Sequence, residues 1–222
     1  ALKVALAQQA QTLSQHIKET RSQISGLQSS LNDQLKVNID EVNRIAKEIA
    51  GLNRSINEAE AGGANNANDL RDQRNQLEMT LSKMIGSKVL VGQVESRNVI
   101  DSNIAIEDGS YTIQVGGFNL VDGIGFHPIG VDDTGNQNGY NDLYYERQDG
   151  VRIPFSSNIT GGKVGALLEL RGSAIGENGE FEDGFLQETI NNLDAFARGM
   201  IEATNNLYAQ TDRKSTRLNS SH

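Results

Sequence analysis

The residue types best suited to chemistry gather in the stretch "NNANDLRDQRNQL", Asn65 to Leu77. Asp69, Arg71, Asp72 and Arg74 supply carboxylates and guanidinium groups at close spacing, but the stretch holds no nucleophile. The same residues suit the start of a helix, where acids favour the positive end of the dipole and charged side chains pair along the helix or with a neighbouring one. We therefore interpret the cluster as helix-packing chemistry.

Other candidate catalytic or metal-binding groups are few. The chain has no Cys, and it lacks the HExxH pattern of a zinc hydrolase. We expect His16 to be a solvated helix residue and His127, in "GFHPIG", to lie at a turn or strand end. These observations predict no catalytic residues, no metal site and no enzymatic activity.

The remaining motifs also fail as binding sites for ions or cofactors. The acidic loop Asp132 to Asp142 does not match a calcium-binding EF-hand, because Gln137 stands where the sixth position requires Gly. The glycines of "GGFNLVDGIG" lack the spacing of a dinucleotide fold, and no phosphate loop is present. We interpret the loop as a polar surface loop and the glycines as turn residues, and we expect no cofactor.

The composition favours a thin core and excludes several partners. Hydrophobic residues make up 36% of the 222 residues and aromatic residues 5%, with no Trp, below the roughly 45–50% apolar content of an average domain. The formal net charge of -9 and pI near 4.9 argue against binding nucleic acid or an anionic membrane. The sequence also has no apolar run of the about 18 residues that a transmembrane helix needs.

The N-terminal third has the apolar spacing of a long helix. Apolar residues alternate steps of four and three from Leu6 to Leu31 and again from Leu35 to Ile56, which is a heptad seam with one irregular step before Leu35. We expect one helix from about residue 1 to 60. Asn38 lies on this seam, and we interpret it as a register-setting or solvent-exposed residue.

A second helix should follow the Gly62-Gly63 breaker. We expect it to begin at Asn68 or Asp69, with the side chain of an Asn or Asp as its cap, and to end at Gly86. We expect its apolar face to pack against the first helix, so that the two helices form a hairpin.

After Gly86 the apolar period changes to two, which predicts strands. Expected strands include "KVLVGQVE", "NIAIE", "SYTIQV" and "FNLV", with hairpin turns at Gly116-Gly117 and at Asp149-Gly150. A short helix at 163–170 and a loop at 173–184 precede a third long helix, whose seam runs from Leu186 to Leu207.

The predicted fold class is therefore α+β. We expect a long antiparallel helical rod, in which the N- and C-terminal helices pair, with an inserted antiparallel β domain. The expected divisions are residues 1–87 (helical hairpin), 88–160 (β domain) and 161–211 (short helix, loop and closing helix). The last segment, 212–222, resembles the translation of a sequencing adapter, and we set it apart as a non-native tail.

Several motifs resemble the FlgK family of flagellar hook-associated proteins. They are "VNRIAKEIAGLNRSI" at 42–56, "NDLRDQRNQLEMTLSKMIGSKVLV" at 68–91, "GSYTIQVGGFNLVDG" at 109–123, "ITGGKVGALLELRG" at 159–172 and "LDAFARGMIEATNNLYAQ" at 193–210. The resemblance covers residues 1–210.

This resemblance implies an extracellular structural subunit of the bacterial flagellum, which joins hook to filament and is exported without a cleaved signal peptide. Implied partners are other copies of the subunit, the hook protein, the second junction protein and an export chaperone for the full-length protein. Family members carry terminal segments that pair as a coiled coil, so we expect this chain to be an internal fragment.

We expect helix packing and assembly to depend on apolar seam residues and on the polar cluster, with residues of the first helix packing against the second helix and the closing helix. The predicted residues are Leu31, Leu35, Val42, Ile45, Ile49, Leu52, Ile56, Asp69, Leu70, Asp72, Gln73, Arg74, Leu77, Leu81, Ile190, Leu193 and Met200.

Two alternatives stay open from the residues alone. One is another axial protein, such as flagellin or the second junction protein, with the same helix-β-helix plan. The other is a secreted carbohydrate-binding module on a helical stalk, which would need exposed aromatic residues. The aromatic residues of the β region are Tyr111, Phe118, Phe126, Tyr140, Tyr144, Tyr145 and Phe155.

Overall fold

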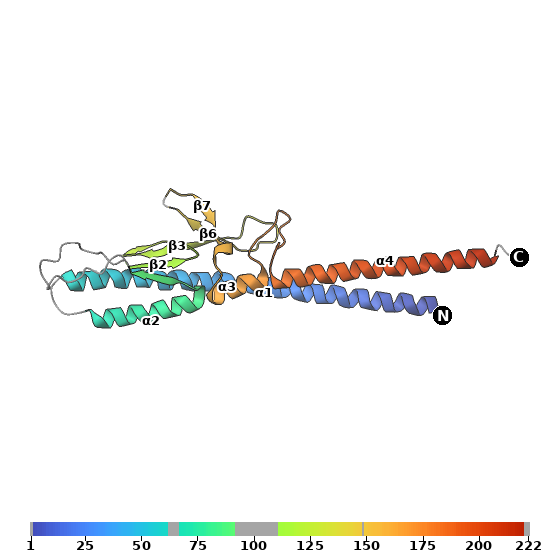
Figure 1. Ribbon diagram of the computed structural model, residues 1–222, viewed down its shortest axis with the longest axis horizontal. Helices are drawn as coiled ribbons and strands as arrows, with labels where there is room; N and C mark the ends of the chain where they lie inside the picture. Colours follow the sequence, from blue (N-terminus) through green and yellow to red (C-terminus); the bar gives the residue numbers. More distant parts are fainter. Residues whose placement is uncertain (1, 62–66, 92–110, 148, 220–222) are drawn as a thin grey trace. The chain divides into compact units, whose positions relative to one another are not determined.

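The structure is a computed structural model that describes residues 2–61, 67–91, 111–147 and 149–219, with side chains described from 4 to 210 within these ranges. Four α-helices and two antiparallel sheets are present in these ranges (Figure 1). The chain is therefore α+β, as the change of apolar period predicts. The expected strand "NIAIE" lies outside the described residues.

By its packing the chain divides into two compact units. Unit 1 comprises residues 1–28 and 185–222, and unit 2 comprises residues 29–184. This division cuts the first helix, whereas the boundaries expected from sequence follow whole elements; those boundaries stay predictions.

Helix α1 (Leu2–Ala61) is the single long helix that the heptad pattern predicts. From Ile17 to Ile49 its inward positions alternate steps of four and three, so the irregular step expected before Leu35 is absent; two consecutive steps of four occur instead from Ile45 to Asn53. The expectation was wrong because the inward face takes Arg21 and Gln28 in place of the more apolar Thr20 and Leu27. The positions in question are Ile17, Arg21, Ile24, Gln28, Leu31, Leu35, Asn38, Val42, Ile45, Ile49, Asn53 and Ile56.

Unit 1 pairs the start of α1 with helix α4 (Phe185–Asn219). The Arg21 guanidinium lies 3.2 Å from the Asp194 carboxylate, and Gln28 Nε2 donates to Gln187 Oε1 at 3.2 Å. Further along α1, from Arg21 to Gln28, the bonded residue lies earlier in α4, from Asp194 to Gln187. The two segments are therefore antiparallel, as predicted. Figure 1 shows them side by side.

The inward face of α4 follows the predicted seam over most of its length. Leu186, Gln187 and Ile190 are buried, and Leu193, Asp194, Ala197, Met200 and Thr204 are half-buried. The last predicted seam residue is wrong, because Leu207 is 48% exposed and Tyr208 turns inward instead. The helix continues to Asn219, within the segment 212–222 that was set apart as a tail.

In unit 2, helix α2 (Asn68–Ile85) lies alongside the second half of α1 (Figure 1). Gly86 ends α2 in the left-handed conformation, with φ of 67°, and its N–H donates to the Ser82 carbonyl. A Cβ on Gly86 would come within 2.8 Å of the Gly161 Cα, just before helix α3 (Gly162–Arg171). Glycine therefore serves both the helix stop and the close approach of α2 to α3.

The β region forms two antiparallel sheets. The first has the order β1 (Lys88–Val91), β2 (Tyr111–Val115), β3 (Phe118–Asp122) and β4 (Gly125–Phe126), and the second has the order β5 (Ile129–Asp132), β6 (Asp142–Glu146) and β7 (Arg152–Pro154). Both expected hairpins are present, β2–β3 and β6–β7.

One apolar core joins the helices of unit 2 to both sheets. Its fully buried members include Leu35 and Ile45 of α1, Leu81 of α2, Ile113 of β2 and Leu143 of β6. From the sequence we expected the first helix to pack against the second helix and the closing helix. The structure adds residues of both sheets to that core. The narrow row of apolar residues on α1 is therefore covered by the sheets as well as by a helix.

Leu77 of α2 is partly buried against this core, so Leu77→Asp should destabilise unit 2. Placing a carboxylate there should lower the free energy of unfolding by about 2–4 kcal/mol. Urea unfolding followed by circular dichroism measures the change. Asn75→Asp, at an exposed α2 position, is the matched control, and an unchanged midpoint for Leu77→Asp would contradict the assigned packing.

Candidate functional site

The arginines at the start of α2 bind the end of α1. Arg71 Nη2 lies 2.7 Å from Glu60 Oε1, and Arg74 Nη1 donates to Asn53 Oδ1 at 3.0 Å. The Arg74 guanidinium also lies 3.9 Å from the centre of the Tyr111 ring. The cluster thus connects α2 to α1 and to strand β2.

The acids and amide of the cluster play a smaller part. Asp69, Asp72 and Gln73 are exposed on α2. The expected side-chain cap at Asn68 or Asp69 is wrong, because the cap residue is Ala67, without a side-chain cap hydrogen bond. Asn68 lies within the first helical turn, so its side chain is past the cap position; Asp69 remains near the positive end of the helix.

The predicted apolar packing residues differ in their burial. Leu35, Val42, Ile45, Ile49 and Leu81 are fully buried in the core of unit 2, and Leu31, Ile56 and Ile190 are buried as well. Leu52, Leu70, Leu77, Leu193 and Met200 are half-buried. Packing of the closing helix against Leu31 to Leu52 stays a prediction, because Ile190, Leu193 and Met200 belong to unit 1.

Three asparagines of α1 bind the backbone of the β region. The clearest case is Asn43, whose Nδ2 donates to the Ile129 carbonyl at 2.9 Å while its Oδ1 accepts from the Ile129 N–H at 2.9 Å. Ile129 begins β5, an edge strand of its sheet. The Asn43 amide therefore acts as a short substitute for a neighbouring strand and satisfies backbone groups that an edge leaves open.

Asn53 and Asn32 make comparable contacts on either side of Asn43. Asn53 Nδ2 donates to the Gly123 carbonyl at 2.6 Å, in the β3–β4 turn, while its Oδ1 accepts from Arg74. Asn32 Oδ1 accepts from the Asn141 N–H at 2.7 Å, and the Asn32 carbonyl accepts from Asn141 Nδ2 at 2.9 Å. We call Asn32, Asn43 and Asn53 the asparagine clamps.

Arg171, at the end of α3, completes the contact at Asn32. Its side chain is fully buried. Nη1 donates to Asn32 Oδ1 at 2.6 Å and to the Asn141 carbonyl at 3.0 Å, and Nε donates to the Gly172 carbonyl at 3.2 Å. One guanidinium thereby joins α1, α3 and the residue before strand β6.

Burial lowers the pKa of Arg171 to about 10, although the nearby Asp142, Tyr140 and Asp183 raise it. The guanidinium stays charged at neutral pH. A buried charge is tolerated only when several acceptors surround it, and the Arg171 contacts supply them.

The loop after α3 closes on itself through Asp183. Its carboxylate accepts from the Ser173 N–H at 2.7 Å, from the Ala174 N–H at 2.8 Å and from the Ser173 hydroxyl. Burial raises the pKa of Asp183, but the hydrogen bonds from Ala174 and Ser173 outweigh it, so the pKa lies below its ordinary value. Phe181, in the same loop, stacks on Tyr140 with ring centres 4.4 Å apart.

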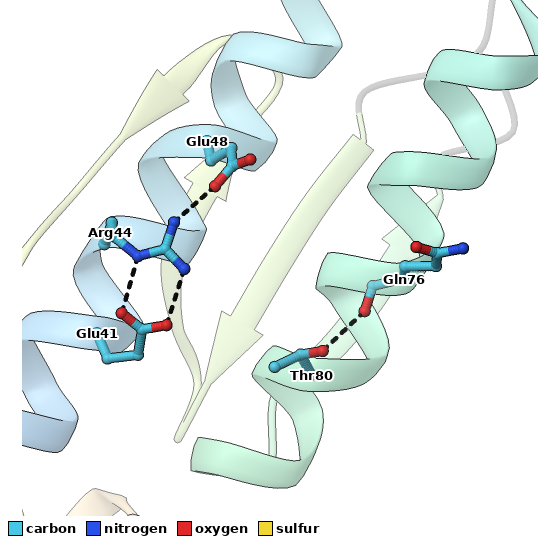
Figure 2. A network of polar contacts seen from close by, with 5 residues as sticks. All are labelled: Glu41, Arg44, Glu48, Gln76 and Thr80. Atoms are coloured by element: carbon cyan, nitrogen blue, oxygen red, sulfur yellow. Dashed lines mark hydrogen bonds and ion pairs between the residues drawn. The ribbon is translucent and has the colours of Figure 1, made fainter.

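The face of α1 that points away from the asparagine clamps carries exposed ion pairs. Figure 2 shows Arg44 between Glu41 and Glu48, with closest distances of 2.8 Å to each carboxylate. The hydrogen bond from Arg44 lowers the pKa of Glu41 despite a small opposing effect of burial. Such solvated pairs contribute little to stability.

Helix α2 has a polar contact of another kind on its exposed side. The Thr80 hydroxyl donates to the Gln76 carbonyl of the same helix at 3.0 Å (Figure 2).

The histidines and the acidic loop show no convergent chemistry. His16 is exposed beside Glu19, and His127 lies just after β4 in a shallow groove with Asp122 and Arg147. Loop residues Asp132 to Tyr140 bond mainly within the loop, whereas Asn141 at its end is buried. Within the described ranges no three histidine, cysteine or carboxylate side chains are placed to share a metal ion.

Asn38 is buried, so the solvent-exposed interpretation is wrong. Its Nδ2 donates to the Gln34 carbonyl at 2.6 Å, within α1 itself. This hydrogen bond lies within one helix, which distinguishes Asn38 from the three asparagine clamps.

Most aromatic residues of the β region pack inside unit 2. Tyr111 and Phe155 are buried, and Phe118 lies 4.9 Å from the Tyr145 ring and 5.3 Å from the Phe155 ring. Arg152 covers Tyr144 at 4.3 Å. These rings serve the core, which weakens the carbohydrate-binding alternative.

Sequence reasoning missed the asparagine clamps and Arg171. The clamps are eleven and ten residues apart on α1, and eleven residues make three helical turns plus about 20°. That spacing was a usable signal: polar amides repeated on the buried side of a helix. Nothing in the local sequence distinguishes Arg171 from a solvated arginine at a helix end.

The fold and these contacts define a class of protein. One long helix, α1, holds the β region through buried amide contacts, and Arg71 and Arg74 of the predicted cluster bind residues of α1. Among the described residues no helix has the length and apolar character that crossing a bilayer requires. The class is a helical structural domain with a sheet packed on its long helix.

Comparison with known proteins gives the family. The chain matches the family model described as the flagellar hook-associated protein FlgK helical domain over residues 1–214. The chain belongs to this family.

Individual relatives agree with that assignment. The chain is 27% identical over 211 residues to flagellar hook-associated protein 1 of Salmonella typhimurium and of Salmonella typhi, covering 92% of this chain and 33% of each relative. It thus spans about a third of their length. The solved structure of the flagellar hook junction protein FlgK from Burkholderia pseudomallei matches with a TM-score of 0.56 and 26% identity, over 72% of this chain and 26% of that one.

Removing the Asn43 clamp should destabilise unit 2. Asn43→Ala leaves the Ile129 N–H and carbonyl without their partner and should lower the free energy of unfolding by about 1–3 kcal/mol. Asn43→Asp keeps the acceptor but loses the donor, so it should not restore wild-type stability. Denaturant unfolding measures wild type and both variants, and Asn38→Ala is the control, because Asn38 is also buried on α1 but its side-chain hydrogen bond is to its own helix. Equal losses for Asn38→Ala and Asn43→Ala would contradict the clamp.

The lowered pKa of Asp183 makes a pH-dependent contribution to stability. Because the folded pKa lies below the unfolded one, the contribution is present above the ordinary pKa of 3.8 and is lost as pH falls through the folded pKa. Asp183→Asn should therefore destabilise the chain at neutral pH and differ less from wild type in strong acid. Thermal melts of both proteins from neutral pH to strong acid test this prediction. A difference in melting temperature that stays the same at every pH would contradict the lowered pKa of Asp183.

Proposed function

We propose that this chain is the helical part of a structural, non-enzymatic subunit that joins the flagellar hook to the filament. Family membership supports the flagellar role, since the named relatives are hook-associated proteins. The observation that carries the proposal is the set of asparagine clamps, which fix the β region on a long helix. A junction subunit must keep its shape while neighbours move against it, and buried amide contacts resist rearrangement because breaking them leaves unsatisfied groups.

The full-length subunit would act outside the cell, after export without a cleaved signal peptide. Its partners would be other copies of itself, the hook protein, the second junction protein and an export chaperone. Family membership supports these partners, and the formal net charge of -9 argues against nucleic acid or an anionic membrane as a partner. The helix-packing residues on α1, α2 and α4 would keep the subunit in the shape that it presents to these partners.

A genetic experiment tests the junction role with the full-length protein. Cells that lack the protein should build hooks without filaments and release filament subunits into the medium. Reintroducing the full-length protein should restore filaments, whereas a version without residues 1–210 should not. Electron microscopy counts filaments per hook, and filament subunit in the medium shows that export still works. Normal filaments in cells that lack the protein would overturn the proposal.

A further inference from the structure

Helix α4 carries large apolar side chains on an exposed face of unit 1. Phe185, Phe196 and Leu207 are 62%, 55% and 48% exposed. They are spaced eleven residues apart, and each step makes three turns plus about 20°, so they share one face of the helix. Isolated exposed apolar residues are ordinary, but an aligned set marks an interaction surface.

Helix α1 adds Leu13 and Leu27, 40% and 49% exposed, to the same side of the helix pair. Leu27 directly precedes the buried Gln28, as Phe185 directly precedes the buried Leu186. One residue back is a rotation of about 100°. Because the two helices are antiparallel, this rotation leads to the same side of the pair on both. We call Leu13, Leu27, Phe185, Phe196 and Leu207 the apolar stripe.

The surroundings of the apolar stripe are almost uncharged. The described residues three or four positions from its members are polar amides, hydroxyls, small residues or apolar residues, apart from His16, Glu182 and Glu188, and those beside Phe196 at the centre carry no charge. The whole chain, in contrast, carries a formal net charge of -9. A second copy could therefore meet this face without bringing carboxylates together at its centre.

The apolar stripe is also complementary to itself. The Arg21–Asp194 and Gln28–Gln187 pairs set the alignment of the two helices, and by that alignment Phe196 is level with Glu19 of α1. Phe185 and Leu207 lie eleven residues to either side of Phe196 on α4.

On α1, Leu13 lies six residues before Glu19 and Leu27 lies eight residues after it. A twofold axis across the stripe at Phe196 would thus place Phe196 opposite the partner's Phe196 and Phe185 opposite the partner's Leu207. It would place Leu13 two residues from the level of the partner's Leu27.

We propose that two copies of this chain associate through their apolar stripes into an antiparallel, twofold-symmetric dimer of unit 1. Its core is a four-helix arrangement in which α1 faces α1 and α4 faces α4. The contact is isologous, because the same patch is used on both copies.

The size of the apolar stripe predicts a weak dimer. Its five side chains expose on the order of 500 Å² per copy, against about 800 Å² per partner in an interface of standard size. We therefore expect dissociation in the micromolar range or above, set by aromatic contact at the centre.

This dimer goes beyond the junction role and is not required by it. A twofold contact closes on itself and cannot extend into a ring or filament. It describes an unassembled state in which each copy covers the other's apolar stripe.

Sedimentation velocity of the complete 222-residue chain over a concentration series tests the dimer. The unmodified chain should shift from monomer to dimer, and Phe196→Asp should weaken the association at least about tenfold, because Phe196 meets its own copy at the axis. Ile201→Asp is the matched control: Ile201 is 60% exposed on the same helix but lies about 140° around it from Phe196. It should leave the dimer unchanged.

Cross-linking gives a second measurement that does not depend on a destabilising charge. The chain has no Cys, so Phe196→Cys and Ile201→Cys each introduce a single thiol. Under mild oxidation Phe196→Cys should form a disulfide-linked dimer and Ile201→Cys should not.

Two results would overturn the proposal: a monomer at every concentration, or equal cross-linking at positions 196 and 201. If cells that lack the protein lose their filaments but the purified chain stays monomeric, the dimer is rejected and the junction role stands. If the purified chain dimerises but cells that lack the protein keep normal filaments, the junction role is rejected and the dimer stands.

Discussion

The structure of unit 2 depends on hydrogen bonds between asparagine side chains of one helix and the backbone of the β region. A sheet that packs on a helix leaves edge and turn groups that no strand satisfies, and burying them unpaired is costly. Asn32, Asn43 and Asn53 supply the missing partners at three levels of α1. Apolar burial holds helix and sheets together, while these amides fix where along the helix each sheet lies.

Buried and exposed polar groups therefore have different roles. Arg171 is fully buried and joins α3 to Asn32 and Asn141, so it can be satisfied in only one arrangement of the three. Arg44, in contrast, pairs with Glu41 and Glu48 in solvent (Figure 2), where water can replace either partner. The junction function that we propose would draw on the buried set, because those contacts restrict the motion of the β region.

Much of the fold was predictable because it depends on periodicity and glycine. The spacing of apolar residues predicted α1 and α4, and Gly86 marked the end of α2. The polar contacts were not predictable in the same way. Apolar patterning assigns Arg21 and Gln28 to solvent, yet both face α4, because their partners Asp194 and Gln187 come from a distant part of the chain. The clamps likewise depend on backbone groups that only the folded β region brings near α1.

Native-state hydrogen exchange in low denaturant, on the unmodified chain, tests the central claim most directly. If the asparagine clamps fix the sheets on α1, the amides of α1 between Asn32 and Asn53 and those of β5 and β6 should open together, with one free energy and one denaturant dependence. If the amides of β5 and β6 exchange at a lower free energy while α1 stays protected, the sheets open independently. That result would contradict the account.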